Sequence, residues 1–264
     1  MIDTGKERHA QEAINKFVQS SCAFLVPGIK DRVAREVGSG VIVCSRNGHH
    51  VILTAKHVAE CAIREEYRLG FFKCSDPIPN FVAGIPTFPN NVDVALLIVK
   101  DNLTPPLNQL AISPELIPTS DQDIQDQDSL VLNGYPGQIS YYNQEQNEQG
   151  FKVMSYWCLL SSNPLDERGR YRVEWKDAIV RGSNKHIDLP SPKGMSGGPL
   201  WRFRKPASGS IWSAGEAGKI VGIQSAWDRK KTVLIEPVQK WSDWFHKSIR
   251  KVDANYGDLG DKRK

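Results

Sequence analysis

The stretch KGMSGGP, Lys193–Pro199, places a serine among small residues in the second half of a 264-residue chain. Small neighbours let the backbone approach another molecule closely and adopt dihedral angles that bulkier residues avoid. A serine hydroxyl is a weak nucleophile unless a nearby base removes its proton. Ser196 therefore indicates chemistry only if the rest of the chain supplies such a base.

Two earlier stretches offer the missing groups. LTAKH, Leu53–His57, ends in an imidazole that can act as a base, and NVDVALL, Asn91–Leu97, places a carboxylate at the entry of an apolar strand. A carboxylate there is costly to bury unless it is paired. Hydroxyl, imidazole and carboxylate are the parts of a charge-assisted nucleophile. The order His57, Asp93, Ser196 is one of the few in which this triad is found.

These three motifs resemble the signatures T-A-x-H, D-[IV]-A-L-L and G-x-S-G-G-P of trypsin-like (chymotrypsin-fold) serine peptidases, in particular the bacterial intracellular type. The resemblance extends from about Ser21 to Ile249. It implies an all-β fold of two antiparallel six-stranded β-barrels, with a short N-terminal helix and a C-terminal helix. It also implies a cleft between the barrels and peptide-bond hydrolysis through an acyl-enzyme, without a metal or an organic cofactor.

The same resemblance assigns roles to residues. His57 takes the proton of Ser196 and later gives one to the leaving amine, while Asp93 fixes the tautomer of the imidazole. The backbone N–H groups of Gly194 and Ser196 form the oxyanion hole. Each residue also has a non-catalytic alternative. His57 would be a structural or surface histidine, Asp93 an exposed aspartate at a strand start, and Ser196 part of a glycine-rich turn without catalytic importance.

A different hydrolase also fits part of the serine stretch. Gly194–Gly198 satisfies G-x-S-x-G, the nucleophile elbow of α/β-hydrolases. That fold requires the acid and then the histidine after the serine, but His246 is the only histidine that follows it. It also requires a helix directly after the elbow, whereas Pro199–Phe203 reads as a strand. We therefore favour the two-barrel interpretation.

Apolar runs and turn residues divide the chain into β-rich regions. We expect an N-terminal helical extension at 1–20, a first barrel at 21–104 with His57 and Asp93, an inter-barrel linker at 105–128, a second barrel at 129–236 with Ser196, a C-terminal helix at 237–252 and a polar tail at 253–264. The boundary lies in a proline-rich polar segment that lacks apolar periodicity. The N-terminal helix either packs on the barrels or docks a partner, and the sequence leaves both open.

Several local features are predicted with less context. Asn47 and Gly48 lie between two β-branched runs, which is typical of a hairpin whose two turn residues both have positive φ. The adjacent His49 and His50 are expected to be exposed. One strand is expected over 152–160, and the polar segment 141–150 is expected to be an exposed loop.

Composition limits the partners. The formal charge of +4 is modest and no Lys/Arg cluster is interleaved with aromatic residues, so no nucleic-acid partner is expected. No apolar run approaches the roughly 18 residues of a membrane span, and the first residues lack the apolar core of a signal peptide. The expected partner is a protein or peptide substrate, and either narrow specificity or a regulatory protein partner restrains the activity.

Cysteine usage indicates a reducing compartment. There are five cysteines, an odd number, and none lies in a C-x-x-C pair. Secreted members of the family place a cysteine directly after the base histidine, where this chain has Val58. We expect free thiols and a cytoplasmic location.

Two departures from the digestive members bear on specificity and activation. Pro190 occupies the position at the base of the specificity pocket, so a preference for Lys or Arg is not supported. The segment Gly222–Trp227 resembles the strand that binds the substrate backbone, which makes Ser225, Ala226 and Trp227 candidate substrate contacts, and Trp227 would narrow the pocket to small or medium apolar side chains.

The second departure is Met195, which replaces the aspartate that pairs with a new N-terminus on activation. An oxyanion loop without that ion pair leaves a second hypothesis open: a catalytically silent or partner-gated trypsin-like domain that acts as a peptide-binding or interaction module.

Overall fold

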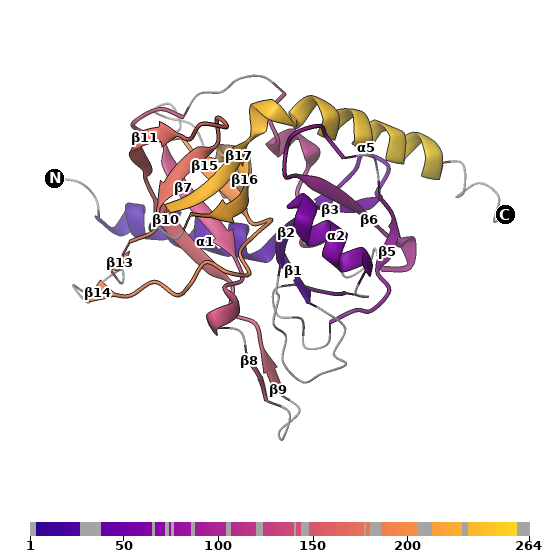
Figure 1. The fold of residues 1–264 in the computed structure, drawn as a ribbon, viewed down its shortest axis with the longest axis horizontal. Helices are drawn as coiled ribbons and strands as arrows, with labels where there is room; N and C mark the ends of the chain where they lie inside the picture. The colour runs from indigo at the N-terminus through magenta and orange to yellow at the C-terminus, as the bar shows by residue number, and fades with distance from the viewer. Residues whose placement is uncertain are drawn as a thin grey trace.

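The computed structural model describes residues 4–26, 38–64, 67–71, 74, 77–85, 88–103, 107–119, 124–139, 141–143, 148–176, 178–179, 186–204, 213–228 and 232–257. Two curled antiparallel sheets dominate these residues and lie side by side (Figure 1), so the expected all-β, double-barrel architecture is confirmed. The first sheet comes from the N-terminal half of the chain and the second from the C-terminal half.

The first sheet has six strands in the order β4-β1-β2-β3-β6-β5. They are β1 (Cys22–Val26), β2 (Gly38–Cys44), β3 (His50–Thr54), β4 (Arg68–Phe71), β5 (Val82–Gly84) and β6 (Ala95–Val99). Every residue of β1, β3 and β6 is buried. Such strands are covered on both faces, which explains why they read as continuous apolar runs rather than as alternating patterns.

The turn between β2 and β3 differs from the expected form. Gly48 has φ +85°, but Asn47 is not among the residues with positive φ. The backbone N–H of Ser45 donates to the carbonyl of His49 at 2.8 Å, so a three-residue turn with one left-handed glycine closes this hairpin. The prediction that His50 is exposed was wrong, since it begins β3 with 1% of its surface accessible.

A helix that the sequence reading missed follows β3. Helix α2 (Lys56–Arg64) begins two residues after the strand ends and carries His57 in its first turn. Its buried residues are Val58, Ala59 and Ala62, which fall on one face at helical spacing. The buried residues of α2 are few and mostly small, so they give only a weak helical pattern in the sequence.

The second sheet has seven strands in the order β10-β7-β15-β16-β17-β12-β11, rather than the six expected. They are β7 (Ser129–Gly134), β10 (Met154–Cys158), β11 (Leu160–Leu165), β12 (Tyr171–Glu174), β15 (Pro199–Phe203), β16 (Gly218–Trp227) and β17 (Thr232–Pro237). The single strand expected over 152–160 is interrupted at Leu159, which is 73% exposed. The chain thereby passes from one edge of the curled sheet to the other.

Two short strand pairs lie outside the main sheets. Strand β8 (Tyr141–Asn143) pairs with β9 (Glu148–Gly150), where an exposed loop was predicted, and β13 (Ala178–Ile179) pairs with β14 (His186–Ile187). The sequence pattern also predicts a strand over 178–180, of which Val180 lies outside the described residues. The remaining short elements are η1 (Asp101–Leu103), η2 (Pro114–Leu116), η3 (Gly137–Ile139), α4 (Ala214–Ala217) and η4 (Val238–Lys240).

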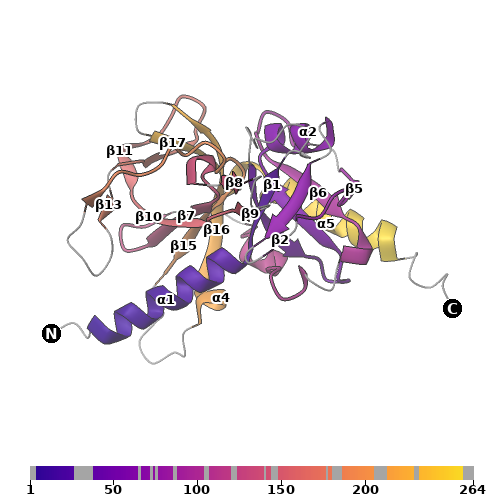
Figure 2. The same ribbon diagram turned by 90° about the horizontal axis from the view of Figure 1, so that it is seen from below.

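The two long helices each cover the sheet from the other half of the chain. Helix α1 (Thr4–Ser20) lies under the second sheet (Figure 2), where the ring centroids of Phe17 and Trp201 are 5.4 Å apart. Helix α5 (Ser242–Gly257) runs from the second sheet across the first (Figure 1), and its Phe245 and Ile249 share one core cluster with Val43. The helix reaches Gly257, five residues beyond the expected end. The packing of α1 confirms the simpler of its two interpretations.

The segment between the halves is packed rather than merely solvated. Ile112 forms a parallel bridge with Val43, and the N–H of Cys44 donates to the carbonyl of Ile112 at 2.9 Å. Ile117 is 1% exposed and joins the core cluster that contains residues of both sheets. The isolated apolar residues Ile112 and Ile117 thus anchor the linker, although the apolar residues of this segment show no periodicity.

Candidate active site

His57 and Asp93 are hydrogen-bonded through both oxygens of the carboxylate. The His57 Nδ1 atom lies 2.7 Å from Asp93 Oδ2, and the backbone N–H of His57 donates to Asp93 Oδ1 at 3.1 Å. The side chains are 49% and 29% exposed, so the pair borders solvent. A carboxylate at Nδ1 holds the proton on that nitrogen and leaves Nε2 as the basic atom.

The serine turn is placed against the strand that leads to His57. Gly197 has φ +89°, and a Cβ there would lie 2.1 Å from both the carbonyl oxygen of Ser39 and the Thr54 hydroxyl. Only glycine permits this approach. Since Thr54 precedes His57 by three residues, the close approach brings Ser196 next to the start of helix α2, which carries the imidazole. The structure nevertheless has no hydrogen bond between the described side chains of Ser196 and His57.

Ser39 binds the serine turn from the first sheet, and the sequence reading missed it. Its backbone N–H donates to the carbonyl of Ser196 at 2.7 Å, and its hydroxyl donates to the carbonyl of Gly194 at 2.8 Å. The same hydroxyl accepts the N–H of Tyr135 at 2.9 Å. The flanking glycines in Gly38-Ser39-Gly40 were the available signal, because a strand with two glycines is typical of a close backbone approach.

The N–H groups expected to form the oxyanion hole have no acceptor among the described residues. The carbonyl of Lys193 accepts the N–H of Gly137 at 2.7 Å. In a trans peptide the carbonyl and the following N–H point in opposite directions, so the N–H of Gly194 points away from Gly137. Gly194 has φ +93°, and a Cβ there would lie 2.7 Å from the N atom of Gly137. The absence of a side chain at Gly194 therefore permits this orientation of the peptide N–H.

Met195 fills the core behind the turn. It is fully buried and packs in an apolar cluster of the second sheet, and its backbone N–H donates to the carbonyl of Pro192 at 3.1 Å. The side chain at this position therefore packs in the apolar core.

The four candidate substrate contacts lie on two segments. The carbonyl of Pro190 accepts the indole N–H of Trp175 at 3.0 Å. Ser225 lies at a register irregularity between β16 and β17, and its hydroxyl donates to the carbonyl of Leu234 at 3.3 Å. Ala226 and Trp227 follow it on β16 and are half-buried. Among the described residues, no hydrogen bond joins Pro190 to these three.

A second buried carboxylate lies on β17, and no motif pointed to it. Glu236 is 5% exposed, and its Oε2 lies 3.6 Å from Lys240 Nζ. Burial raises the pKa of Glu236 above its usual value, while the positive charges of Lys240 and Arg170 oppose the shift.

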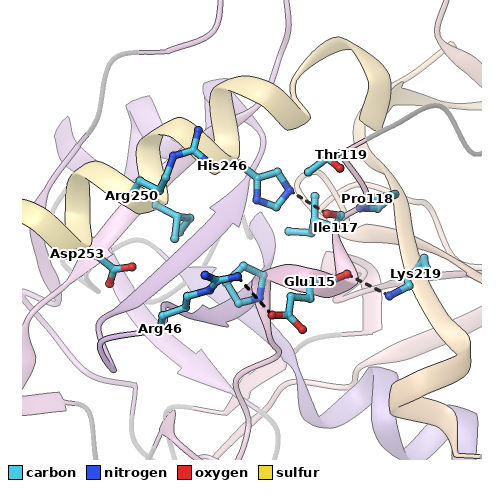
Figure 3. Close-up of a pocket in the computed structure, with 11 residues that line it drawn as sticks. Arg46, Glu115, Ile117, Pro118, Thr119, Lys219, His246, Arg250 and Asp253 are labelled. Carbon is cyan, nitrogen blue, oxygen red and sulfur yellow. Dashed lines mark hydrogen bonds and ion pairs between the residues drawn. The ribbon is translucent and has the colours of Figure 1, made fainter.

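A separate pocket lies away from these residues. It has a volume of 460 Å³ and lies between α5 and the segment that contains η2 (Figure 3). His246 Nε2 lies 2.9 Å from the carbonyl oxygen of Ile117, and Lys219 donates to the carbonyl of Glu115 at 3.0 Å. None of the predicted site residues lines it. Within the described ranges there is neither a cluster of three metal-ligating side chains nor a helix long and apolar enough to cross a membrane.

Comparisons with known proteins support the fold. The sequence matches no protein-family model and no curated protein. A serine endoprotease from Yersinia pestis aligns over 90% of this chain and 66% of its own, with a TM-score of 0.51 and 18% identity. The inactive form of the Rv3671c protease aligns over 90% of this chain and 94% of its own, with a TM-score of 0.49 and 15% identity. The chain has the fold of trypsin-like serine proteases.

Proposed function

We propose that the protein is a serine endopeptidase that hydrolyses peptide bonds through an acyl-enzyme. The observation that carries the proposal is the 2.7 Å contact between His57 Nδ1 and Asp93 Oδ2 next to the turn that bears Ser196. A histidine oriented in this way is a competent general base for a neighbouring hydroxyl. The fold shared with serine proteases supports the same conclusion.

In the proposed reaction, His57 Nε2 removes the proton of Ser196 as the oxygen attacks the scissile carbonyl. The negative charge that develops on the carbonyl oxygen is received by the N–H groups of Gly194 and Ser196. His57 then gives its proton to the leaving amine, and water repeats the sequence to release the acyl group. Asp93 stays ionised throughout and stabilises the imidazolium. These steps require no metal or organic cofactor.

The cleavage preference belongs to the same proposal. Pro190 provides no carboxylate for a Lys or Arg side chain, and Trp227 would restrict the pocket. We expect cleavage after small or medium apolar residues, and cleavage only after Lys or Arg would contradict this. Since none of the five cysteines, all of them among the described residues, forms a disulfide, a reducing cytoplasmic compartment fits the chain.

The alternative function is a partner-gated or silent domain that binds peptides. The specific observation in its favour is that no hydrogen bond joins Ser196 to His57 in the described structure. Catalytic hydrogen bonds are often long before substrate binds, so this geometry does not exclude catalysis. The fixed orientation of Gly194 N–H favours a formed oxyanion loop and hence the enzyme.

The test combines a fluorophosphonate probe with a cleavage profile on proteome-derived peptides, for the wild type and Ser196→Ala. We expect probe labelling and cleavage by the wild type only, because loss of the nucleophile lowers turnover by about 10⁶-fold. Equal signals from both proteins would contradict the proposal. Absence of labelling that is restored by a cell extract would support the gated alternative.

A further inference from the structure

The serine turn uses most of its backbone N–H groups internally and leaves two without an acceptor. Within 194–198, the N–H groups of Met195, Gly197 and Gly198 donate to backbone carbonyls. The N–H groups of Gly194 and Ser196 have no acceptor among the described residues. In the proposed reaction these two groups receive the negative charge of the substrate, so the direction in which they point matters for catalysis.

The direction of the Gly194 N–H depends on two anchored carbonyls. The carbonyl of Lys193, which belongs to the same peptide group, accepts the N–H of Gly137 at 2.7 Å. The carbonyl of Gly194 itself accepts the hydroxyl of Ser39 at 2.8 Å. Glycine has a wide choice of backbone dihedral angles, so a Gly194 held at only one of these carbonyls could rotate into another conformation. The hydrogen bond from Ser39 therefore fixes the second of the two peptide groups that meet at Gly194.

Ser39 uses all of its polar groups at this place, and none of its surface is accessible. Its hydroxyl donates to Gly194 and accepts the N–H of Tyr135 at 2.9 Å. Its backbone N–H donates to the carbonyl of Ser196 at 2.7 Å, and its carbonyl accepts the hydroxyl of Thr54 at 2.6 Å. An alanine would keep the two backbone contacts but leave the Gly194 carbonyl and the Tyr135 N–H without these partners, which is costly for buried groups. The hydroxyl thus has a task that the backbone of Ser39 does not perform.

We infer that Ser39 is a positioning residue that holds the oxyanion-binding N–H of Gly194 in place through the hydrogen bond from its hydroxyl to the Gly194 carbonyl. The inference rests on the proposed peptidase function. It adds a residue of the first sheet to a part of the site that is otherwise built by the second half of the chain. In this role Ser39 acts through Gly194 rather than through a contact with substrate.

The sequence allows the Gly194 N–H to be observed by itself. The dipeptide Lys-Gly occurs once in the chain, at Lys193-Gly194. A protein labelled with NMR-active isotopes at the carbonyl carbon of lysine and the nitrogen of glycine therefore gives one carbonyl–amide correlation, that of the Gly194 N–H. This measurement requires no enzymatic activity.

The experiment compares the wild type, Ser39→Ala and Ser21→Ala. Ser21 is the matched control, because it is also buried and its hydroxyl donates to the carbonyl of Val18 at 3.2 Å, away from the serine turn. We expect Ser39→Ala to shift or broaden the Gly194 resonance and to lower the second-order rate of fluorophosphonate labelling about 10²-fold, the lower end of the effect of removing one oxyanion donor. Ser21→Ala should leave both unchanged.

Peptide cleavage gives a further readout. The Gly194 N–H acts on charge that develops in the transition state, so the loss in Ser39→Ala should appear in kcat and not in KM. A loss confined to KM would contradict a role in the oxyanion hole.

The remaining outcomes separate this inference from the peptidase proposal. Labelling of Ser39→Ala at the wild-type rate would overturn the positioning role, and so would a slow variant whose Gly194 resonance is unchanged. An equal loss in Ser21→Ala would also overturn it, because the effect would then be that of any buried hydroxyl. If Ser39→Ala does not fold, Ser39→Cys decides by the same criteria, since a thiol is only a weak hydrogen-bond donor. If the wild type is not labelled at all, the peptidase proposal fails, while the resonance still shows whether Ser39 holds the Gly194 peptide.

Discussion

The two halves of the molecule position their functional residues by different kinds of contact. In the first half, a side chain makes the contacts: the Asp93 carboxylate bonds the imidazole Nδ1 of His57 at 2.7 Å and accepts the backbone N–H of His57 at 3.1 Å. In the second half, Ser196 is held through the backbone, by a turn whose glycines have φ of +93° and +89°. A side-chain pair can form within one half alone, but a backbone turn pressed against Ser39 depends on both halves.

The difference shows where each part of the site is vulnerable. A substitution in the side-chain pair should remove function and leave the fold intact. A substitution in the turn should disturb the contact between the halves, since Ser39 of the first sheet binds the carbonyls of Gly194 and Ser196. Activity and stability should therefore separate in the first half and fall together in the second.

The largest effect on activity is expected for Asp93→Asn. The amide keeps the shape of the side chain but favours the wrong imidazole tautomer, and in a related triad this change lowers turnover about 10⁴-fold. We expect a loss of this order in the rate of probe labelling or peptide cleavage, with the free energy of unfolding changed by less than about 1 kcal/mol. If Asp93→Asn lowered the activity and the free energy of unfolding together, activity and stability would not separate in the first half.

The next effect concerns Gly197→Ala. The added Cβ would lie 2.1 Å from the carbonyl oxygen of Ser39, at a φ that other residues rarely adopt. We expect the free energy of unfolding to fall by about 3 kcal/mol or more, together with loss of labelling. Gly48→Ala is the matched control, because φ is +85° but no atom lies within 4 Å of the added Cβ. Urea denaturation should show that Gly48→Ala lowers the free energy of unfolding by only about 1 kcal/mol. Equal losses at Gly48 and Gly197 would contradict the packing argument.

The smallest effect concerns an ionic pair of the second half that has no catalytic role. Burial alone would raise the pKa of Asp128, but hydrogen bonds from Arg204 at 2.8 and 2.9 Å and from the N–H of Gln125 outweigh it, and the pKa is lowered. We expect Asp128→Asn to cost about 1 kcal/mol of unfolding free energy at pH 7, with labelling unchanged.

The sign of the pH dependence follows from the lowered pKa. A carboxylate with a lower pKa in the folded state stabilises the protein above its unfolded value of about 4, and this stabilisation is lost as the pH falls through the folded value. The difference between wild type and variant should therefore shrink as the pH falls below about 4 and through the lower pKa of the folded state. A difference that stays constant over this range, measured by urea titration, would contradict the ionic origin.

The sequence predicted the parts of the fold that depend on local pattern. Strand β15 was predicted over Pro199–Phe203 and lies there, because a short and mostly apolar run directly after a glycine-rich turn has few alternatives. Helix α2 was missed because its buried face consists of small residues. The break in the strand expected over 152–160 was missed because Leu159 is apolar and looks like a buried strand residue in the sequence. Its exposure between β10 and β11 depends on the curl of the sheet.

The site was predictable where it depends on motifs and not where it depends on long-range contacts. His57 and Asp93 were paired in advance from their order and neighbours, and the structure places them in contact. Ser39 donates to the backbone carbonyl of Ser196, which lies 157 positions away in the sequence. Such partners carry no motif, because any residue can provide a backbone N–H or carbonyl.

The packing of α5, the last helix, on the first sheet has a consequence for folding during synthesis on the ribosome. Phe245, Ile249 and Val252 of α5 complete an apolar cluster with strands of the first sheet, although α5 follows every strand in the chain. Synthesis proceeds from the N-terminus at roughly 5–20 residues per second, so the first sheet emerges many seconds before the helix that covers it. The apolar face of the first sheet is therefore covered only after α5 has left the exit tunnel.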